Sequence, residues 1–315
     1  MSYAATLFLL VTVNFFLPRA MPGDPIEALL SRSSTTYIDN EDTRAELTEY
    51  YGLDRSLVGQ YGRYLGGLVR GDLGTSIRTN APVRDALRDR LPWTLLLVGA
   101  STAVATAVGL VAGIHAGWRR GRPVDRGLLG LFLGLREFPT FLLGSLALFV
   151  FAVKLDWVPL AGARTPFAEL SLLGQVNDVA AHLVLPATVL AVGLAAGHYL
   201  VMRAGMVSEL GADYLLLGRA KGLAERRLKY RYAARNALLP VVSLTAIQLG
   251  FAVTGAVLVE RVFAYPGIGR LLFESIGARD YPAIQGCFLV TTVIVVSVNA
   301  LADVLYRRLD PRTLG

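Results

Sequence analysis

The sequence has few of the residues that carry enzyme and metal chemistry. Its one cysteine, Cys287, excludes a disulfide scaffold, and its three histidines include no H-E-x-x-H motif. His115 and His198 fall near or within apolar runs, where we expect packed, hydrogen-bonded side chains and not metal ligands. None of the three lysines follows a glycine, so the sequence holds no Walker A loop for ATP phosphates. We therefore expect no catalytic residue, no metal site and no cofactor bound by this chain.

Charged side chains are scarce as well. They make up 17% of the 315 residues, against about a quarter in an ordinary globular protein, while 54% of the residues are apolar. The mean hydropathy is +0.49. This composition excludes a disordered chain and a coiled coil. It is typical of an all-α polytopic membrane protein, which is the fold class that we expect.

Long apolar runs predict where the chain crosses the membrane, because a bilayer core needs about 20 apolar residues in a helix. Five windows of the sequence meet this length: Leu91–Trp118, Leu128–Val153, Leu183–Val201, Leu239–Val259 and Ala283–Leu305. A sixth run, Tyr3–Leu17, is short, and its first cation is Arg19. It lacks the basic start and the cleavage site of a signal peptide. We interpret residues 1–18 as a first transmembrane helix with a late or clipped start, which makes six helices.

The placement of Arg and Lys predicts the orientation in the membrane. On one side of the predicted helices, residues 118–126, 203–236 and 306–315 hold 15 cations and 5 acids, a net charge of +10. On the other side, residues 19–90, 154–182 and 261–283 hold 15 cations and 16 acids. By the positive-inside rule, the +10 side and both termini face the cytoplasm. Because these cations lie between apolar runs, we expect no nucleic-acid partner.

One cytoplasmic segment, Glu209–Pro240, has the pattern of a docking surface. The sequence predicts a helix over Asp213–Ala220, capped by its first residue, and a second, cation-rich helix over Ala224–Ala237. Gly222 separates the two helices and supplies the positive φ that a tight corner needs. The apolar run Tyr214–Leu217 would face water in a solvated linker. A short amphipathic helix that docks into a partner's groove explains this run better.

Short motifs in this segment and along the chain carry a family resemblance. The segment contains Ala220-Lys221-Gly222-Leu223 and Arg235-Asn236-Ala237-Leu238-Leu239-Pro240, with the proline 18 residues after the glycine. It resembles the EAA loop of bacterial ABC importer permeases, in particular those of the peptide/nickel type, although Gly218-Arg219-Ala220 replaces the literal Glu-Ala-Ala. Further segments match the same subfamily, in order along nearly the whole chain: Ala20–Pro25, Tyr51–Asp54, Arg70–Ser76, Val262–Gly269, Arg279–Pro282 and Leu309–Arg312.

The resemblance implies a type I ABC importer permease in a bacterial inner membrane. Such a subunit is embedded in membrane lipid and works with a second homologous permease, two ATP-binding subunits or domains and an extracytoplasmic substrate-binding protein. These partners, and not this chain, would bind ATP and Mg²⁺. The loop would be the coupling helix that seats in a cleft of the ATPase. The residues expected to take part are Tyr214, Leu217, Arg219, Ala220, Lys221, Gly222, Leu223, Arg235, Asn236 and Pro240.

Beyond the first helix, we expect the chain to have two further parts. Residues 19–90 would form a small extracytoplasmic cap, and residues 91–315 a five-helix core that includes the coupling loop 209–240. We interpret the cap as a lid and as a dock for the binding protein, two roles that are compatible. Pro92 would open the second helix, where a proline suits the first turn. After the fifth transmembrane helix, a short helix over Gly269–Ile276 would dip into the membrane between two proline turns.

We expect this chain to pass dipeptides or oligopeptides through the membrane while partner subunits hydrolyse ATP. Import of nickel chelates or another small solute by the same type of importer stays open, as does a gradient-driven secondary transporter. The secondary transporter needs ionisable residues inside the membrane, and Arg136-Glu137 before Pro139 is a candidate pair. This pair either forms a polar clamp between helices or lines the translocation cavity, for which Gln248 and Thr254 are further candidates.

Overall fold

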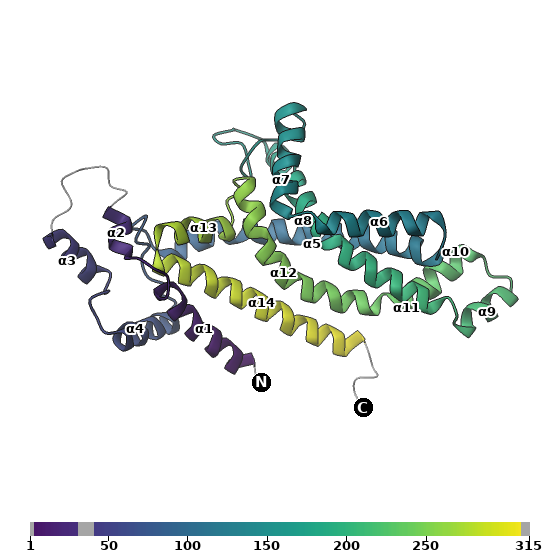
Figure 1. Ribbon diagram of the computed structural model, residues 1–315, viewed down its shortest axis with the longest axis horizontal. Coiled ribbons are helices and arrows are strands. Elements are labelled where there is room, and N and C mark those ends of the chain that lie inside the picture. The colour runs from purple at the N-terminus through teal and green to yellow at the C-terminus, as the bar shows by residue number, and fades with distance from the viewer. Residues whose placement is uncertain (1–2, 31–40, 310–315) are drawn as a thin grey trace. The chain divides into compact units, whose positions relative to one another are not determined.

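The computed structural model describes residues 3–30 and 41–309, and within these ranges the chain is built from helices (Figure 1), as the sequence predicts. The α-helices are α1 (Tyr3–Arg19), α2 (Pro25–Leu30), α3 (Glu41–Tyr50), α4 (Leu57–Arg70), α5 (Val83–Trp118), α6 (Pro123–Glu137), α7 (Thr140–Leu148), α8 (Leu172–Glu209), α9 (Asp213–Ala220), α10 (Glu225–Arg227), α11 (Ala234–Ala237), α12 (Leu239–Val262), α13 (Ile268–Ala278) and α14 (Tyr281–Leu309). Two π-helical segments are η1 (Phe149–Lys154) and η2 (Leu228–Ala233). Beyond Leu309, the predicted motif Leu309–Arg312 lies outside the described residues.

The chain divides into two compact units. Unit 1 comprises Met1–Thr94 and Pro266–Val296, and unit 2 comprises Leu95–Tyr265 and Ser297–Gly315. The long helices α5 and α14 each contribute one part to each unit.

Several helices are long and apolar enough to cross a membrane. They are α5, α8, α12 and residues Tyr281–Leu301 of α14, and α6 together with Thr140–Lys154 forms a further, bent candidate. The first predicted span is present as α1, which is apolar but shorter. The described residues therefore hold four or five candidate spans, which confirms a polytopic membrane protein. The full set of six spans stays a prediction.

The predicted third span is two helices and not one. α6 ends at Glu137, and the helix that begins at Thr140 runs at 95° to it. Phe138 between them has extended backbone, with φ −74° and ψ 126°, because the ring of Pro139 disfavours a helical conformation in the residue before it. The window Leu128–Val153, predicted as the third span, is therefore a bent pair of helices with its break at Pro139.

α5 begins before the span that the sequence predicts. It starts at Val83 and passes through Pro92, so the prediction that Pro92 opens this helix is wrong. Pro92 cannot donate a backbone hydrogen bond. However, Val83 and Leu87 in the preceding turns are buried in an apolar cluster with Ile268 and other residues of α13 and α14. This burial favours a helix on both sides of the proline. The predicted boundary between the cap and the five-helix core, at residues 90 and 91, therefore falls inside α5.

In unit 1, α4 packs along α1. The rings of Tyr61 and Tyr64 lie 5.1 and 5.4 Å from the ring of Phe15, which is fully buried. Asn14 donates hydrogen bonds to the Tyr64 hydroxyl at 3.2 Å and to the Gln285 carbonyl of α14 at 2.8 Å. These contacts hold α4 against α1 and α14. The location of α4 outside the membrane stays a prediction.

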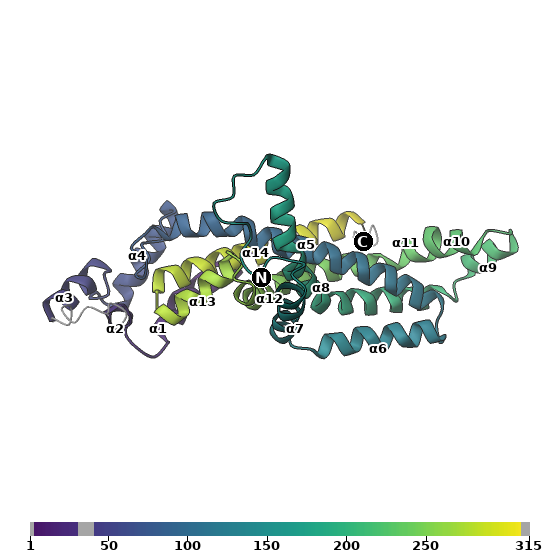
Figure 2. The ribbon, with the colours of Figure 1, turned by 90° about the horizontal axis from the view of Figure 1, so that it is seen from above.

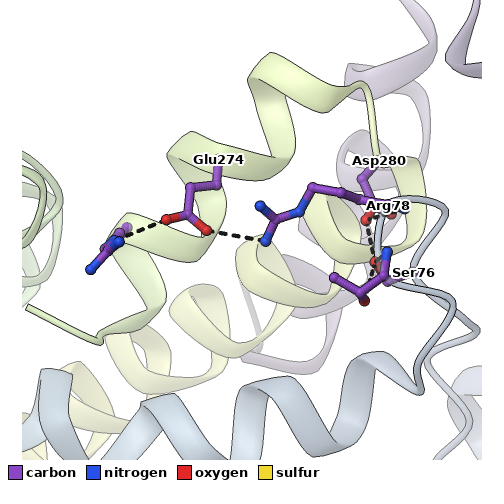
Figure 3. A network of polar contacts seen from close by, with 6 residues as sticks. Ser76, Arg78, Glu274 and Asp280 are labelled. Carbon is purple, nitrogen blue, oxygen red and sulfur yellow. Dashed lines mark hydrogen bonds and ion pairs between the residues drawn. The ribbon is translucent and has the colours of Figure 1, made fainter. Parts of the chain in front are cut away.

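A polar network ties the loop after α4 to the end of α13 and the start of α14 (Figure 3). The buried carboxylate of Asp280 accepts a hydrogen bond from the Ser76 hydroxyl at 2.5 Å. Glu274 of α13 forms ion pairs with Arg78 at 3.1 Å and with Arg270 at 2.8 Å. α13 is the short helix that the sequence predicts after the fifth span, and its dip into the membrane stays a prediction.

In unit 2, α5 and α8 approach closely because glycines face the contact. Gly109, Gly113 and Gly117 recur at every fourth position of α5. A Cβ atom on any of them would lie 2.5–2.7 Å from the Cβ of a residue of α8. Small residues at this spacing let membrane helices pack backbone against backbone. α6 also runs alongside α8 (Figure 2), and Phe132 stacks on Tyr199 with 4.4 Å between the ring centroids.

The fully buried His198 joins three helices of unit 2. Its Nε2 lies 3.1 Å from the hydroxyl oxygens of Thr106 in α5 and Thr245 in α12. Its Nδ1 lies 3.2 Å from the carbonyl oxygen of Leu194 in α8. The prediction of a packed, hydrogen-bonded histidine is confirmed.

Candidate functional site

The loop between α8 and α12 contains two helical segments, as the sequence predicts. The first is α9, and the second runs through α10, η2 and α11. Asp213 does not cap α9, because the capping position is Ala212, whose backbone is extended, and Asp213 is the first helical residue. An acidic residue in the first turn still favours the helix through its dipole. Pro240 lies in the first turn of α12, which confirms that it ends the loop.

Gly222 forms the corner between the two segments. Its φ is +74°, in the left-handed region that favours glycine. The N–H of Gly222 donates to the Arg219 carbonyl at 2.9 Å, and the N–H of Leu223 donates to the Gly218 carbonyl at 3.0 Å. These two bonds are the Schellman arrangement that closes a helix C-terminus. The predicted role of Gly222 at this corner is therefore confirmed.

Gly218 allows α9 to approach the second segment. A Cβ atom on Gly218 would lie 2.5 Å from Cδ2 of Leu228 and 3.5 Å from Cδ1 of Leu223. Leu228 is fully buried, so it has little room to move aside. The sequence marked Gly218 only as a departure from the literal Glu-Ala-Ala. Its packing role was missed because the contact depends on how the chain folds back after Gly222.

α9 has one buried side and one exposed side. Leu215 is fully buried, whereas Leu216 and Leu217 are 68% and 55% exposed. Leu215 belongs to an apolar cluster formed by Met202, Met206, Leu215, Leu228, Ala233, Ala234, Ala237 and Val241. The cluster fixes α9 on the end of α8 and on the second segment. A fixed helix that presents two exposed leucines is what docking into an apolar groove requires.

Glu209, at the end of α8, connects two of the predicted loop residues. The Tyr214 hydroxyl donates a hydrogen bond to Glu209 Oε2, and Asn236 Nδ2 donates to the same oxygen at 3.4 Å. Burial and the Glu209 hydrogen bond raise the pKa of Tyr214 to about 12, so this hydroxyl remains a donor at neutral pH. Sequence reasoning missed Glu209, because no spacing rule brings the end of α8 between α9 and α11.

The other predicted loop residues surround this core. Arg219 forms an ion pair with Glu225 at 2.9 Å, and its guanidinium carbon lies 5.8 Å from the centre of the Trp118 ring. Leu223 is partly buried against the apolar cluster. The other predicted residues are exposed, among them Leu217, Arg219, Lys221 and Arg235. The loop therefore presents apolar and cationic side chains together.

The four candidate cavity residues lie on two helices. Arg136 and Glu137 are exposed at the end of α6. Within the described part of the chain, neither side chain forms an ion pair or a hydrogen bond, so a polar clamp between helices is not observed there. On α12, Thr254 is exposed and Gln248 is half-buried. A Cβ atom on Gly197 of α8 would lie 2.2 Å from Gln248 Nε2, so the amide fits against a glycine.

Comparison with known proteins assigns the chain to a family. Residues 109–315 match the family described as "Binding-protein-dependent transport system inner membrane component". A putative peptide permease protein of Brucella suis is 40% identical over 308 residues, which cover 97% of this chain and 94% of that protein. The oligopeptide transport system permease protein AppB of Bacillus subtilis is 36% identical, over 95% of this chain and 92% of its own length.

A third relative and a solved structure extend the comparison. The glutathione transport system permease protein GsiC of Escherichia coli K12 is 35% identical over 97% of this chain and 94% of its own length. The fold resembles an inward-facing structure of the MetNI methionine ABC transporter, with a TM-score of 0.56 and 18% identity, over 71% of this chain and 96% of that chain. The chain thus belongs to the family of binding-protein-dependent transport system inner membrane components, as a permease of the peptide type.

Proposed function

We propose that this chain is a membrane subunit of an ATP-driven importer for peptides, and that the loop between α8 and α12 couples it to the ATPase. The observation that carries the proposal is the geometry of α9. Leu215 anchors the helix in a buried cluster, while Leu216 and Leu217 remain exposed. Two exposed leucines on a water-facing helix favour an apolar partner surface. The exposed Lys221 directly after α9 suits an acidic rim.

The rest of the assembly follows from this role. The chain pairs with a second similar permease, two ATP-binding subunits or domains and an extracytoplasmic binding protein, and these ATP-binding parts hold ATP and Mg²⁺. The loop and both termini face the cytoplasm of a bacterial inner membrane, because the cations gather on that side. The segment 19–90 lies outside the membrane, as a lid and a dock for the binding protein. Closure of the ATPases moves the loop as a rigid body and switches the spans between two access states.

Peptides are the proposed substrate class because the relatives point to them by name. Two of the relatives are called peptide and oligopeptide permeases, and a third is called a glutathione permease. Glutathione is itself a small peptide, so the three names share a chemistry of amide bonds and charged ends. A binding protein that selects the peptide would leave the permease to provide a path of modest polarity.

Reconstitution of the complete importer tests this function. The chain is purified with the second permease and the ATPases encoded by neighbouring genes, placed in liposomes and supplied with the binding protein. Uptake of a labelled dipeptide, an oligopeptide, glutathione and a nickel chelate is then compared. We expect ATP-dependent peptide uptake that persists when ionophores remove all ion gradients. Uptake that needs a gradient and no ATP would instead identify a secondary transporter.

We also propose that Arg136 and Glu137 line the translocation pathway. Both side chains are exposed at the break between α6 and α7, and a charge at membrane depth is stable only where it is wet or paired. Separate Arg136→Gln and Glu137→Gln variants are compared for uptake of peptides with free and with blocked ends. Selective loss for one end supports a pathway role. Equal loss together with a lower melting temperature would assign the pair to assembly.

A further inference from the structure

An apolar groove runs between α5 and α6 in unit 2. It has a volume of about 580 Å³. Apart from His115, its lining is aliphatic: Ala107, Val108, Val111, Ala112, His115, Val124 and Leu128. Val108 and Val111 are 48% and 59% exposed, so the groove is open along its length. Both helices belong to candidate spans, which places the groove against the hydrocarbon of the bilayer.

The groove ends at a cluster of cations. His115, at one end of the groove, lies with its Nε2 3.3 Å from the Tyr230 hydroxyl. Lys229, the neighbour of Tyr230, is largely buried, with its Nζ 4.9 Å from the centre of the Tyr230 ring. Arg119 follows directly after α5, about one helical turn beyond His115. Burial and, to a smaller degree, the charge of Arg119 lower the pKa of Lys229. Two cations thus lie beyond the His115 end of the apolar groove, which we call its mouth.

These two cations have no acidic partner. Among residues 3–30 and 41–309, no carboxylate forms an ion pair with Lys229 or Arg119. The acid in the first turn of α6, Asp125, is buried and is already bound by Arg203, at 2.6 and 2.8 Å. Burial of a cation near a second cation is costly unless an anion neutralises them. The mouth of the groove therefore suits a bound anion.

We propose that this site binds an anionic phospholipid, with its phosphate between Lys229 and Arg119 and one acyl chain along the groove. Charge complementarity favours this occupant, because basic pockets at the membrane surface between helices bind acidic headgroups. A free phosphate would satisfy the cations but would leave the aliphatic groove uncovered. A helix from a partner protein would cover the groove but would add no negative charge at its mouth.

The bound lipid would support the coupling loop. Arg119 follows α5, whereas Lys229 lies in η2, the segment that packs under α9. A phosphate that contacts both would tie the loop to the end of a membrane helix and relieve the repulsion between the two cations. This consequence holds whichever solute the importer carries, so it does not depend on the proposed peptide substrate.

A binding experiment with matched variants tests the site. The full chain is purified with its partner subunits in neutral detergent, and its melting temperature is followed as dioleoylphosphatidylglycerol or dioleoylphosphatidylcholine is added. We expect stabilisation by the anionic lipid only. Each cation near a lipid surface contributes on the order of fivefold in affinity, so the Arg119→Gln/Lys229→Gln variant should bind phosphatidylglycerol roughly 25-fold more weakly. The single variant Arg119→Gln changes an exposed residue and should bind phosphatidylglycerol about fivefold more weakly. It tests the site in case the double variant folds poorly.

Three controls decide between the occupants. Arg84→Gln/Arg88→Gln removes two exposed cations at the opposite end of α5 and should keep wild-type lipid affinity. Val111→Trp fills the groove and should weaken lipid binding while both cations remain. Three results would each overturn the proposal. They are an equal loss of lipid affinity in the control variant and in Arg119→Gln/Lys229→Gln, stabilisation by inorganic phosphate alone, and unchanged lipid affinity in Val111→Trp. A cross-link from Val111→Cys to a partner subunit would also overturn it, because it would show that protein covers the groove.

Discussion

Ser76 donates a hydrogen bond to Asp280, although 204 positions separate the two residues. The same carboxylate accepts hydrogen bonds from the backbone N–H groups of Ile77 at 3.1 Å, Arg78 at 3.3 Å and Ala283 at 3.3 Å. Asp280 is 1% exposed, so its charge is balanced by these donors and not by water. One buried carboxylate thereby fixes the loop after α4 to the turn that begins α14.

This arrangement predicts that Asp280→Ala lowers the free energy of unfolding of unit 1 by about 3 kcal/mol, since it leaves buried donors without an acceptor. Thermal and denaturant unfolding in detergent measure the loss. Asp54→Ala removes an exposed carboxylate from the same unit and serves as the control, with little change expected. Equal melting temperatures for Asp280→Ala and wild type would show that the network does not hold the loop.

The ion pairs of Glu274 predict a dependence of stability on pH. Burial raises the pKa of Glu274, but the Arg270 hydrogen bond and the charges of Arg270, Arg78 and Arg90 outweigh it and hold the pKa below its ordinary value of 4.5. A carboxyl group with a lower pKa in the folded state stabilises the fold fully above pH 4.5. That stabilisation is lost as the pH falls through the pKa of the folded state.

The measurement compares melting temperatures of wild type and Glu274→Gln across this pH range. Wild type should be more stable near neutral pH, and the difference should shrink as the pH falls below 4.5. Glu49→Gln, at an exposed position, controls for the loss of one carboxylate. A difference that stays constant with pH would mean that the ion pairs do not stabilise the fold.

Local patterns predicted the loop between α8 and α12 well, because its signals are short-range. The positive φ of Gly222 and the end of the loop at Pro240 both follow from rules that concern a few neighbouring residues. The contacts of Gly218 and Glu209 could not be predicted in this way. Each joins segments that meet only after the chain has turned back at Gly222, so no spacing in the sequence reveals them.

The membrane helices show the same limit. Hydropathy located the apolar windows, but it joined α6 and α7 in one window, because the short charged pair Arg136-Glu137 lies between two longer apolar runs. Pro92 illustrates the reverse case, in which a proline lies inside a continuous helix. The two prolines differ in the packing around them. Val83 and Leu87 are buried before Pro92, whereas Phe138 is 55% exposed before Pro139.

Two glycines of the loop should respond differently to substitution. Gly218→Ala places a Cβ 2.5 Å from Leu228 Cδ2 and should cost about 1–3 kcal/mol through overpacking. Gly222→Ala meets no atom within 4 Å and should cost only about 1 kcal/mol through its positive φ. In a Leu228→Ala background, Gly218→Ala should cost little, because the space is then free. A double-mutant cycle on the free energy of unfolding measures this coupling. Strictly additive effects of Gly218→Ala and Leu228→Ala would show that the two residues do not pack against each other.

We propose that Leu216 and Leu217 of α9 carry the contact through which the ATPase drives transport. The most direct measurement is ATP hydrolysis and peptide uptake in the same proteoliposomes, for wild type and for Leu216→Asp/Leu217→Asp. Leu172→Asp/Leu173→Asp changes two leucines that are 82% and 79% exposed at the start of α8 and serves as the matched control. We predict a folded variant that loses the ATPase or hydrolyses ATP without uptake, while the control retains coupling. Wild-type uptake by Leu216→Asp/Leu217→Asp would contradict the claim.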